Sequence, residues 1–295
     1  MIVLVAGAGG HLGRELLAEL RRRGHTTRAL VRDPAKLPAD AADEVVVADA
    51  EHADLEPACR GADVVFSAMG ASSRFDRGPR RHYRETDTKP NLRLLEAAER
   101  NGVDRFAYVT ILHAEKLRGN AYIDAHEDVV DRLHDSKLAH TIIRANGFFS
   151  IYDEMLDTIE KGRYRLIGDP DRLHNPIHDA DLAAACADAL ENGTEEVEVG
   201  GPETLTRRQE AELAYAALGQ AGTPVRRLPT PLVRVAAAVM RPADPRRAAV
   251  ADLIWRISSI DALGPAYGTR TLGDYLASRA SQPPTRTSTE RSASS

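Results

Sequence analysis

The sequence predicts an α/β fold in which a doubly wound parallel sheet is followed by a smaller, mostly helical C-terminal lobe. Short runs of β-branched residues alternate with helical stretches through the first half of the 295 residues, which is typical of parallel strands joined by helical crossovers. A glycine-rich segment lies directly between the first run and the first helix. From Thr206 to about Ala277 the pattern is mostly helical and prolines interrupt it.

The alternation begins with a buried strand at 2–6, and the helix that follows has leucines at positions 12, 16, 17 and 20. We expect further strands at 26–31, 44–47, 63–68, 106–110 and 141–144, and helices near 89–101 and 122–135. Pro90 is tolerated because it falls in the first turn of its helix. A helix from about Asp179 and a short strand at 197–199 return to the sheet.

Composition excludes several classes of partner. The formal net charge of −5 gives no basic excess for phosphate-backbone contacts, so we expect no nucleic acid partner. No apolar run approaches the roughly 20 residues that span a bilayer, so we expect no membrane partner and a cytoplasmic protein. Cys59 and Cys186 lie far apart without metal-ligand spacing, which indicates free thiols and no metal site. We expect a monomer or homodimer that binds a small-molecule substrate.

Glycine occupies every third position of the segment after the first strand, and the segment reads Gly7-Ala8-Gly9-Gly10-His11-Leu12-Gly13. This spacing lets the chain turn tightly and lets its backbone approach a pyrophosphate without an intervening Cβ. The helix that opens at His11 offers free N–H groups and the positive end of its dipole to the phosphates. The strand before and the amphipathic helix after it are the context that this motif requires, so the segment predicts a Rossmann sheet that binds NAD(P).

The end of the second strand predicts the choice between NADPH and NADH. Versions of this fold that prefer NAD place an acid here to bind the ribose 2′-hydroxyl, whereas this chain has Arg32. A guanidinium can bind a 2′-phosphate through two hydrogen bonds, and Lys36 adds positive charge. Two alternatives remain, because Asp33 could serve the ribose of NADH or could pair with Arg32 at the surface. We expect NADPH, with NADH less favoured.

An ordered set of motifs resembles the atypical short-chain dehydrogenases/reductases, the NmrA-like group with NAD(P)H-binding domains. The set covers about residues 1–215 and comprises GAGGHLG, LVRDPAKL, VVVADAEHADLEPACRGADVVFSAMG, TDTKPNLRLLEAAERNGVDRFAYVT, AYIDAHEDVVDRL, LAHTIIRANGFF, NPIHDADLA and VGGPETLTRRQ. The resemblance implies that Asp49, with Ala50 beside it, lies near the adenine amino group. It implies that the end of the fourth strand passes under the adenosine ribose at Ser67, Ala68, Met69 and Gly70. It also implies that a loop after the sixth strand borders the nicotinamide at Ala145, Asn146, Gly147 and Phe148.

Reductases of the resembled class use Tyr-x-x-x-Lys, in which the tyrosine donates a proton and the lysine lowers its pKa. Tyr122 falls at the tyrosine position, but His126 stands where the lysine would be. His126 could bind the ribose or act as the acid/base itself, since an unperturbed histidine titrates near neutral pH. The alternative is that both residues belong to an inward-facing stripe of the helix. Thr110 is the natural third member, although many relatives place that hydroxyl about two residues later, where Leu112 stands, and His113 is nearby.

Three other groups of charged or titratable residues could suggest a binding site, and for each we favour a structural role. His174, His178 and Asp181 invite a metal site, but Pro176 breaks the helix between them, so we expect His178 or Asp179 to cap the next helix. Arg77, Arg80 and Arg81 lie in a predicted loop after the fourth strand and could bind an anionic substrate, although a solvated loop is favoured. Arg246 and Arg247 are interpreted as a solvated helix start.

The predicted domains are an NAD(P)-binding Rossmann domain at 1–150, to which 178–202 return, a substrate lobe at 151–177 and 203–280, and a disordered tail at 281–295. The favoured function is an NADPH-dependent oxidoreductase that transfers hydride to a small carbonyl, enone or quinone-like substrate. One alternative is an NADP(H)-binding regulator or sensor without turnover, suggested by the missing lysine. The other is a non-redox isomerase or cyclase that uses His126 for proton transfer.

Overall fold

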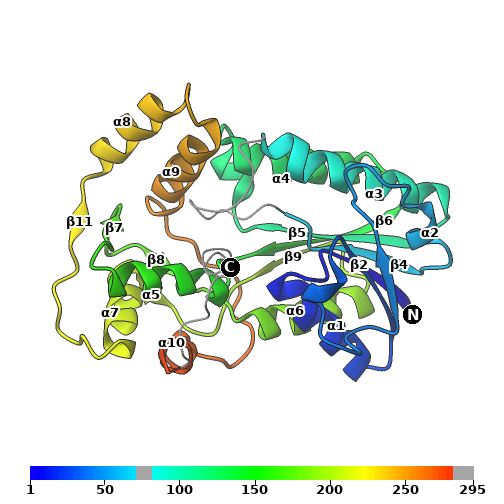
Figure 1. Cartoon of the computed structure of the whole chain (residues 1–295), viewed down its shortest axis with the longest axis horizontal. Helices are drawn as coiled ribbons and strands as arrows, with labels where there is room; N and C mark the ends of the chain where they lie inside the picture. Colours follow the sequence, from blue (N-terminus) through cyan, green and yellow to red (C-terminus); the bar gives the residue numbers. More distant parts are fainter. Residues whose placement is uncertain (71–81, 282–295) are drawn as a thin grey trace, which may run out of the picture.

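The computed structural model describes residues 1–70 and 82–281, which form a parallel sheet with helices on both faces and a second group of helices beyond its carboxyl edge (Figure 1). Within these residues the central sheet has seven strands: β1 (Ile2–Ala6), β2 (Thr26–Val31), β3 (Glu44–Val47), β4 (Val64–Ser67), β5 (Arg105–Ile111), β6 (Ala139–Ala145) and β9 (Glu196–Val199). Their spatial order is β3-β2-β1-β4-β5-β6-β9, and every neighbouring pair is parallel. The predicted fold class is therefore confirmed.

Alternation along β1 explains the two layers of helices. Val3 and Val5 face the leucine stripe of α1 (His11–Arg22), and α6 (Asp179–Glu191) packs beside α1 on the same face. Leu4 and Ala6 point to the opposite face. That face is covered by α2 (Glu56–Cys59), α3 (Lys89–Arg100) and α4 (Ala121–His134).

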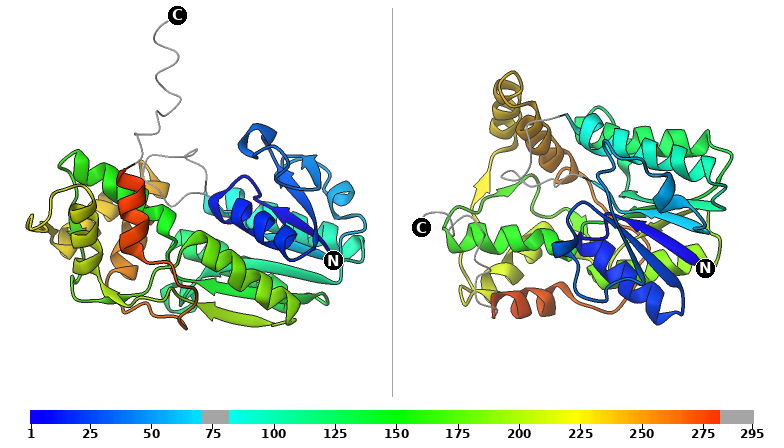
Figure 2. Two further views of the ribbon diagram at one scale, coloured as in Figure 1. Left: turned by 90° about the horizontal axis from the view of Figure 1, so that it is seen from below. Right: turned by 45° about the vertical axis from the view of Figure 1, so that its right-hand side comes forward.

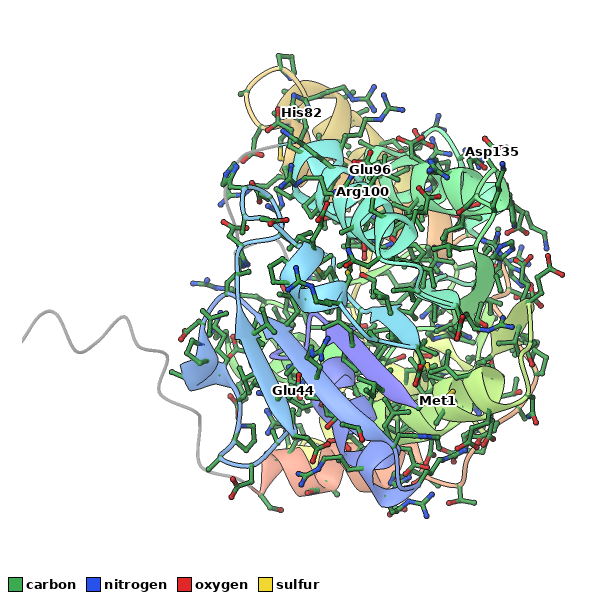
Figure 3. All side chains as sticks on the ribbon, turned by 90° about the vertical axis from the view of Figure 1, so that its right-hand side faces the viewer. Met1, Glu44, His82, Glu96, Arg100 and Asp135 are labelled. Carbon is green, nitrogen blue, oxygen red and sulfur yellow. The ribbon has the colours of Figure 1, made fainter. Side chains whose placement is uncertain are left out.

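Helix α3 shows how patterning selects the buried face. Leu94 and Leu95 are fully buried against the sheet, whereas Glu96 and Arg100 lie on the solvent side of the helix (Figure 3). A turn of π-helix at Arg84–Thr88 precedes α3, and Pro90 stands in its first turn as predicted. The π-turn itself was not predicted.

The C-terminal helices form two clusters, which are visible from two further directions in Figure 2. The first cluster packs α5 (Tyr152–Glu160), α7 (Arg207–Ala217) and α10 (Leu272–Ala280) around Phe149 and Tyr152. The second consists of α8 (Thr230–Met240) and α9 (Pro245–Ile257), and α9 lies against α4. Short ladders join β8 (Leu173–His174) to β10 (Leu205–Thr206), and β7 (Leu166–Ile167) to β11 (Arg227–Leu228). Short 3-10 turns occur at Pro34–Lys36, Ala114–Leu117 and Phe149–Ile151.

The structural interpretation of the histidine-rich segment is confirmed. His178 Nδ1 accepts a hydrogen bond from the Ala180 N–H at 3.0 Å and so caps α6. Asp181 holds the loop before α10, because it accepts from the backbone N–H groups of Thr269 and Arg270. Across the described part of the chain, no group of three or more His, Cys, Asp or Glu side chains is arranged to hold a metal ion.

Other expectations have mixed outcomes. Cys59 and Cys186 are free thiols, as predicted, and both are buried. No helix in residues 1–70 and 82–281 is long and apolar enough to cross a lipid bilayer. Residues 282–295 of the predicted tail lie outside the described residues, as do Arg77, Arg80 and Arg81. The predicted domain boundaries stay a prediction, although β9 does pair with β6 as the return to the sheet requires.

Candidate functional site

The glycine segment connects β1 to α1 by a turn that only glycine allows at two positions. Gly7 has a φ of +77°, and a Cβ there would lie 2.7 Å from the carbonyl oxygen of Ala68 on the neighbouring strand. A Cβ on Gly13 would collide with the carbonyl oxygen of Gly7. The Gly10 N–H donates to that same oxygen at 2.9 Å, which closes the turn. The backbone of this turn, where β1 and β4 end and α1 begins, is therefore not covered by side chains of its own.

A cavity of about 540 Å³ opens above this turn, at the carboxyl ends of β1 to β4. This is the crevice where ligands bind in open parallel sheets. Ten of the residues predicted to bind the cofactor line it: Gly7, Gly9, Gly10, Arg32, Lys36, Asp49, Ala50, Ala68, Met69 and Gly70. The other three predicted residues of the glycine segment, His11, Leu12 and Gly13, do not line the cavity. The side chain of Leu12 is buried in the core.

The residues present fit a dinucleotide. The glycine turn lines the cavity with backbone that carries no side chain, at Gly7, Gly9 and Gly10. The first turn of α1 leaves N–H groups without intrahelical partners, and these suit a pyrophosphate. Asp49 keeps its place at the end of β3 through a hydrogen bond from the Glu51 N–H to its Oδ1 at 3.0 Å. The chemistry of this donor set is that of a phosphate and ribose site.

Two cations lie at the β2 end of the cavity. Arg32 is exposed, and within the described residues it forms no ion pair with Asp33. Asp33 instead caps the following 3-10 turn, since its Oδ1 accepts from the Ala35 N–H at 3.1 Å. The stem of Lys36 lies over the glycine turn, because a Cβ on Gly9 would be 3.2 Å from Lys36 Cβ. The surface-pair alternative for Arg32 therefore has no support in the geometry.

Eight lining residues were not among those predicted to bind the cofactor. Five of them lie at the ends of β2 and β3, and the other three, Thr86, Pro90 and Arg246, come from the helices. Arg246 was interpreted as a solvated helix start; it does lie in the first turn of α9, but the prediction that it is solvated is wrong. Its side chain is buried, and its guanidinium lies 5.1 Å from the centre of the Tyr83 ring. The folding of α9 onto α4 buries it, and no local pattern in the sequence signals that contact.

Tyr122 and His126 share one face of α4, and their rings lie 4.8 Å apart. Asn120 begins the helix, and its Oδ1 accepts from the Tyr122 N–H at 3.0 Å. On the other side Tyr83 packs edge-on against Tyr122, with ring centres 5.1 Å apart. The Tyr108 hydroxyl, on β5, lies 2.8 Å from His126 Nδ1. The structure therefore brings the two predicted residues together with two tyrosines that were not predicted.

Burial decides the protonation of this cluster. It raises the pKa of Tyr108 well above its usual value, so the phenol keeps its proton. Among the described residues His126 Nδ1 is the one acceptor within hydrogen-bond distance of that O–H, at 2.8 Å, so the tautomer with Nδ1 accepting is the one that satisfies it. Burial also lowers the pKa of His126 to about 4, so the ring is neutral at neutral pH. With Nδ1 accepting, the remaining proton resides on Nε2.

The Nε2–H group of His126 points toward the strand end that lines the cavity. Nε2 is buried and has no hydrogen-bond partner among the described residues. A Cβ on Gly70 would lie 3.7 Å from Nε2 and 3.5 Å from Cε1. A buried donor without a partner is unfavourable in a folded protein, so this N–H is suited to meet a ligand at Gly70.

Tyr122 and Thr110 retain their hydroxyl protons. Burial, followed by the charge of Asp87, raises the pKa of Tyr122 above its usual value. Thr110 follows Tyr108 by two residues on β5, so both side chains face α4. The Thr110 hydroxyl is buried without a partner in the described part of the chain. Neither Tyr122, His126 nor Thr110 lines the 540 Å³ cavity, so their predicted catalytic roles stay predictions.

The loop after β6 is tied to the C-terminal lobe. The Asn146 side chain donates to Asn175 Oδ1 at 2.7 Å and to the Ala262 carbonyl at 2.8 Å. Gly147 lies against His174, and Phe148 forms a parallel bridge with Ile177. None of the four predicted residues, Ala145 to Phe148, lines the cavity, so their contact with a nicotinamide also stays a prediction.

Comparisons with known proteins agree with this site. A family model described as NAD(P)H-binding matches residues 7–193. The divinyl chlorophyllide a 8-vinyl-reductase of Zea mays is 27% identical over 239 residues, covering 74% of this chain and 59% of the relative. Quinone oxidoreductase 2 of Escherichia coli is 28% identical over 154 residues, covering 50% of this chain and 49% of the relative. The chain spans about three fifths of the first of these relatives and half of the second.

Among solved structures, an NADPH-dependent quinone oxidoreductase of Escherichia coli complexed with NADPH superposes with a TM-score of 0.73. Its sequence is 22% identical, and the match covers 94% of this chain and 99% of that one, which shows a shared fold. The family model spans more than half of the chain and includes the glycine turn, Tyr122, His126 and every residue that lines the cavity except Arg246. The chain belongs to the NAD(P)H-binding family.

Proposed function

We propose that the chain is an NADPH-dependent oxidoreductase that transfers hydride to a small carbonyl, enone or quinone-like substrate. The observation that supports it most is a pair of hydrogen-bond donors on one face of α4, the hydroxyl of the partly buried Tyr122 and the buried His126 Nε2–H, which faces Gly70 at the cavity. A bound dinucleotide would supply the hydride. The chain's own residues would bind it through the glycine turn, select its 2′-phosphate through Arg32 and Lys36, and present an O–H to the acceptor oxygen.

Among these acceptors, quinones and enones fit the protein best. A simple ketone that receives hydride becomes an alkoxide and needs a strong proton donor, but the raised pKa of Tyr122 makes its phenol a weak acid. A quinone or enone spreads the new negative charge over a conjugated system, so its oxygen is less basic than an alkoxide and does not need a strong proton donor. Hydride adds to the acceptor, and one proton from Tyr122 or from water completes the reduced product.

The isomerase or cyclase alternative loses support from the same geometry. It requires His126 to accept a proton, but Nδ1 already accepts from Tyr108 and Nε2 carries the ring proton. The sensor alternative gains support from one observation, the raised pKa of Tyr122 without a neighbouring lysine to lower it. It remains the second candidate.

Acceptor-dependent oxidation of NADPH separates the two. The wild type is expected to oxidise NADPH with a benzoquinone or cyclohexenone and far more slowly with cyclohexanone. Tyr122→Phe is expected to abolish the residual ketone activity, by about a hundredfold or more, and to reduce the quinone rate less. If no acceptor from any of these classes oxidises NADPH although NADPH binds, the oxidoreductase proposal fails and the sensor is favoured.

A further inference from the structure

Helix α8 is apolar on two sides, and only one of them is covered by the protein. Its inner side buries Val233 and Ala237 against Ala251 and Trp255 of α9. Its outer side carries four apolar residues at the spacing i, i+3, i+4, i+7, and all of them are exposed: Leu232, Val235, Ala236 and Val239. We call these four residues the outer stripe. The exposed fractions are 58% for Leu232, 62% for Val235 and 73% for Val239, which is the largest among the exposed large hydrophobic residues.

The surroundings of the outer stripe are basic. Four exposed arginines lie on α8 or within four residues of it in the sequence, Arg226, Arg227, Arg234 and Arg241, and the sequence has no aspartate or glutamate from Leu213 to Ala243. Arg227 also donates to the Gly168 carbonyl at 3.2 Å. This contrasts with a whole chain whose formal net charge is −5. Arg234 also stacks on Trp255, with its guanidinium 4.9 Å from the ring centre.

Acidic groups of the neighbouring helix do not neutralise these arginines. On α9, Asp252 accepts from Arg256 at 2.7 Å and from Asn120 at 2.8 Å. Asp244 caps α9 through the Arg247 N–H at 3.0 Å. Within residues 1–70 and 82–281, no carboxylate forms an ion pair with any of the four arginines around α8.

We propose that α8 is an interfacial helix, by which the protein binds the surface of an anionic lipid bilayer. An exposed apolar stripe flanked by arginines is the pattern of a helix that lies in the plane of a membrane. The stripe enters the boundary between headgroups and acyl chains, and the arginines meet the anionic headgroups. The expectation of no membrane partner rested on the absence of a spanning segment, and surface binding does not need one.

Charge argues against other occupants. A second copy would place α8 against itself, because the common symmetric interface uses the same patch twice, and eight arginines would then face each other. The two segments outside the described residues, 71–81 and 282–295, hold one large apolar side chain between them, Phe75, so neither supplies a matching stripe. The outward position of α8 leaves room for a flat surface (Figures 1 and 2).

The test is flotation of the full chain with phosphatidylcholine vesicles, with and without phosphatidylglycerol. The wild type is expected to float only with the anionic vesicles. The double variant Val235→Glu/Val239→Glu is expected to stay at the bottom, and the matched control Val45→Glu/Val47→Glu, with exposed fractions of 49% and 57% on β3, is expected to float. Arg226→Gln and Arg241→Gln should each weaken binding to anionic vesicles by about fivefold.

Three results would overturn the proposal: no flotation of the wild type, equal flotation with neutral vesicles, or flotation that the stripe variants do not change. Light scattering on the same proteins identifies the competing occupant. If the wild type is a dimer that Val235→Glu/Val239→Glu converts to a monomer, and neither binds vesicles, then α8 is an interface between copies. The readouts do not depend on turnover, so this proposal and the proposed function can fail separately.

Discussion

The Tyr108 hydroxyl, 2.8 Å from His126 Nδ1, assigns the ring proton of His126 to Nε2. The bond connects β5 to α4 and leaves the donor facing Gly70 at the edge of the cavity. In a site without the usual lysine, this pair offers a neutral hydrogen-bond donor instead of a positive charge. The consequences for affinity, pH dependence and turnover differ from those of a lysine and can be measured.

Tyr108→Phe removes the proton donor to His126 and leaves Nδ1 buried without a partner. We expect the free energy of unfolding to fall by about 1–3 kcal/mol, because an unsatisfied buried acceptor is unfavourable. We also expect weaker NADPH binding, since either tautomer of His126 then becomes accessible. Urea unfolding and calorimetric titration measure the two effects. Unchanged NADPH affinity would mean that the tautomer is unimportant for the cofactor.

His126 predicts a loss of stability in mild acid. Its folded pKa of about 4 lies below the unfolded value of 6.5, so the unfolded chain binds the extra proton as the pH falls. The stabilisation is present above pH 6.5 and is lost progressively from there down to pH 4. Between pH 7 and pH 5 the contribution of His126 is about 2 kcal/mol.

Urea unfolding of the wild type and of His126→Gln at both pH values isolates that contribution. Buried His174 and partly buried His178 also have lowered pKa values and remain in both proteins, so they act as an internal reference. A wild type and variant that lose equal stability between pH 7 and pH 5 would refute the assignment.

Arg32→Ala should weaken NADPH binding about ten- to a hundredfold and leave NADH binding little changed, because a bidentate charge-assisted contact to the 2′-phosphate is lost. Arg60→Ala removes the same charge from an exposed position that does not line the cavity, and it serves as the control. Calorimetric titration gives both affinities. Equal losses for the two cofactors, or for the two variants, would show that Arg32 does not read the 2′-phosphate.

Gly7→Ala and Gly102→Ala separate two costs of adding a Cβ: backbone strain at positive φ, which both variants have, and a steric clash, which only Gly7→Ala has. Both glycines have positive φ, +77° and +66°, but only a Cβ on Gly7 meets another strand, at 2.7 Å from Ala68 O. We expect a loss of about 1–2 kcal/mol for Gly102→Ala and about 3–5 kcal/mol for Gly7→Ala, with NADPH binding lost only in the latter. Thermal unfolding with a fluorescent dye measures the difference. Equal losses would show that β4 moves aside.

The strands of the sheet could be predicted because their signal is local. The bounds of each strand predicted in the central sheet lie within two residues of the observed bounds. The glycine turn, Arg32 and Asp49 each follow one of these strands within two residues, so their positions could be predicted as well. Parallel crossovers then bring those ends to one edge, so the cofactor half of the site was predictable.

The other half depends on contacts between distant segments. The Tyr108 hydroxyl reaches His126 only when β5 and α4 are packed in this register, and nothing near Tyr108 distinguishes it from a core residue. Arg246 joins the cavity from more than 150 positions beyond Thr86 and Pro90 in the sequence, because α9 packs against α4. The outer stripe of α8 was hidden for the same reason, since sequence alone does not show which side of an apolar helix is covered.

The most direct test of the central claim is acceptor-dependent oxidation of NADPH by the purified wild type with a small benzoquinone, followed by the absorbance of the reduced nicotinamide. We expect turnover with a kcat/KM for NADPH at least about tenfold higher than for NADH, as a contact of Arg32 with the 2′-phosphate requires. NADPH that binds but is not oxidised, or turnover without preference between the two cofactors, would contradict it.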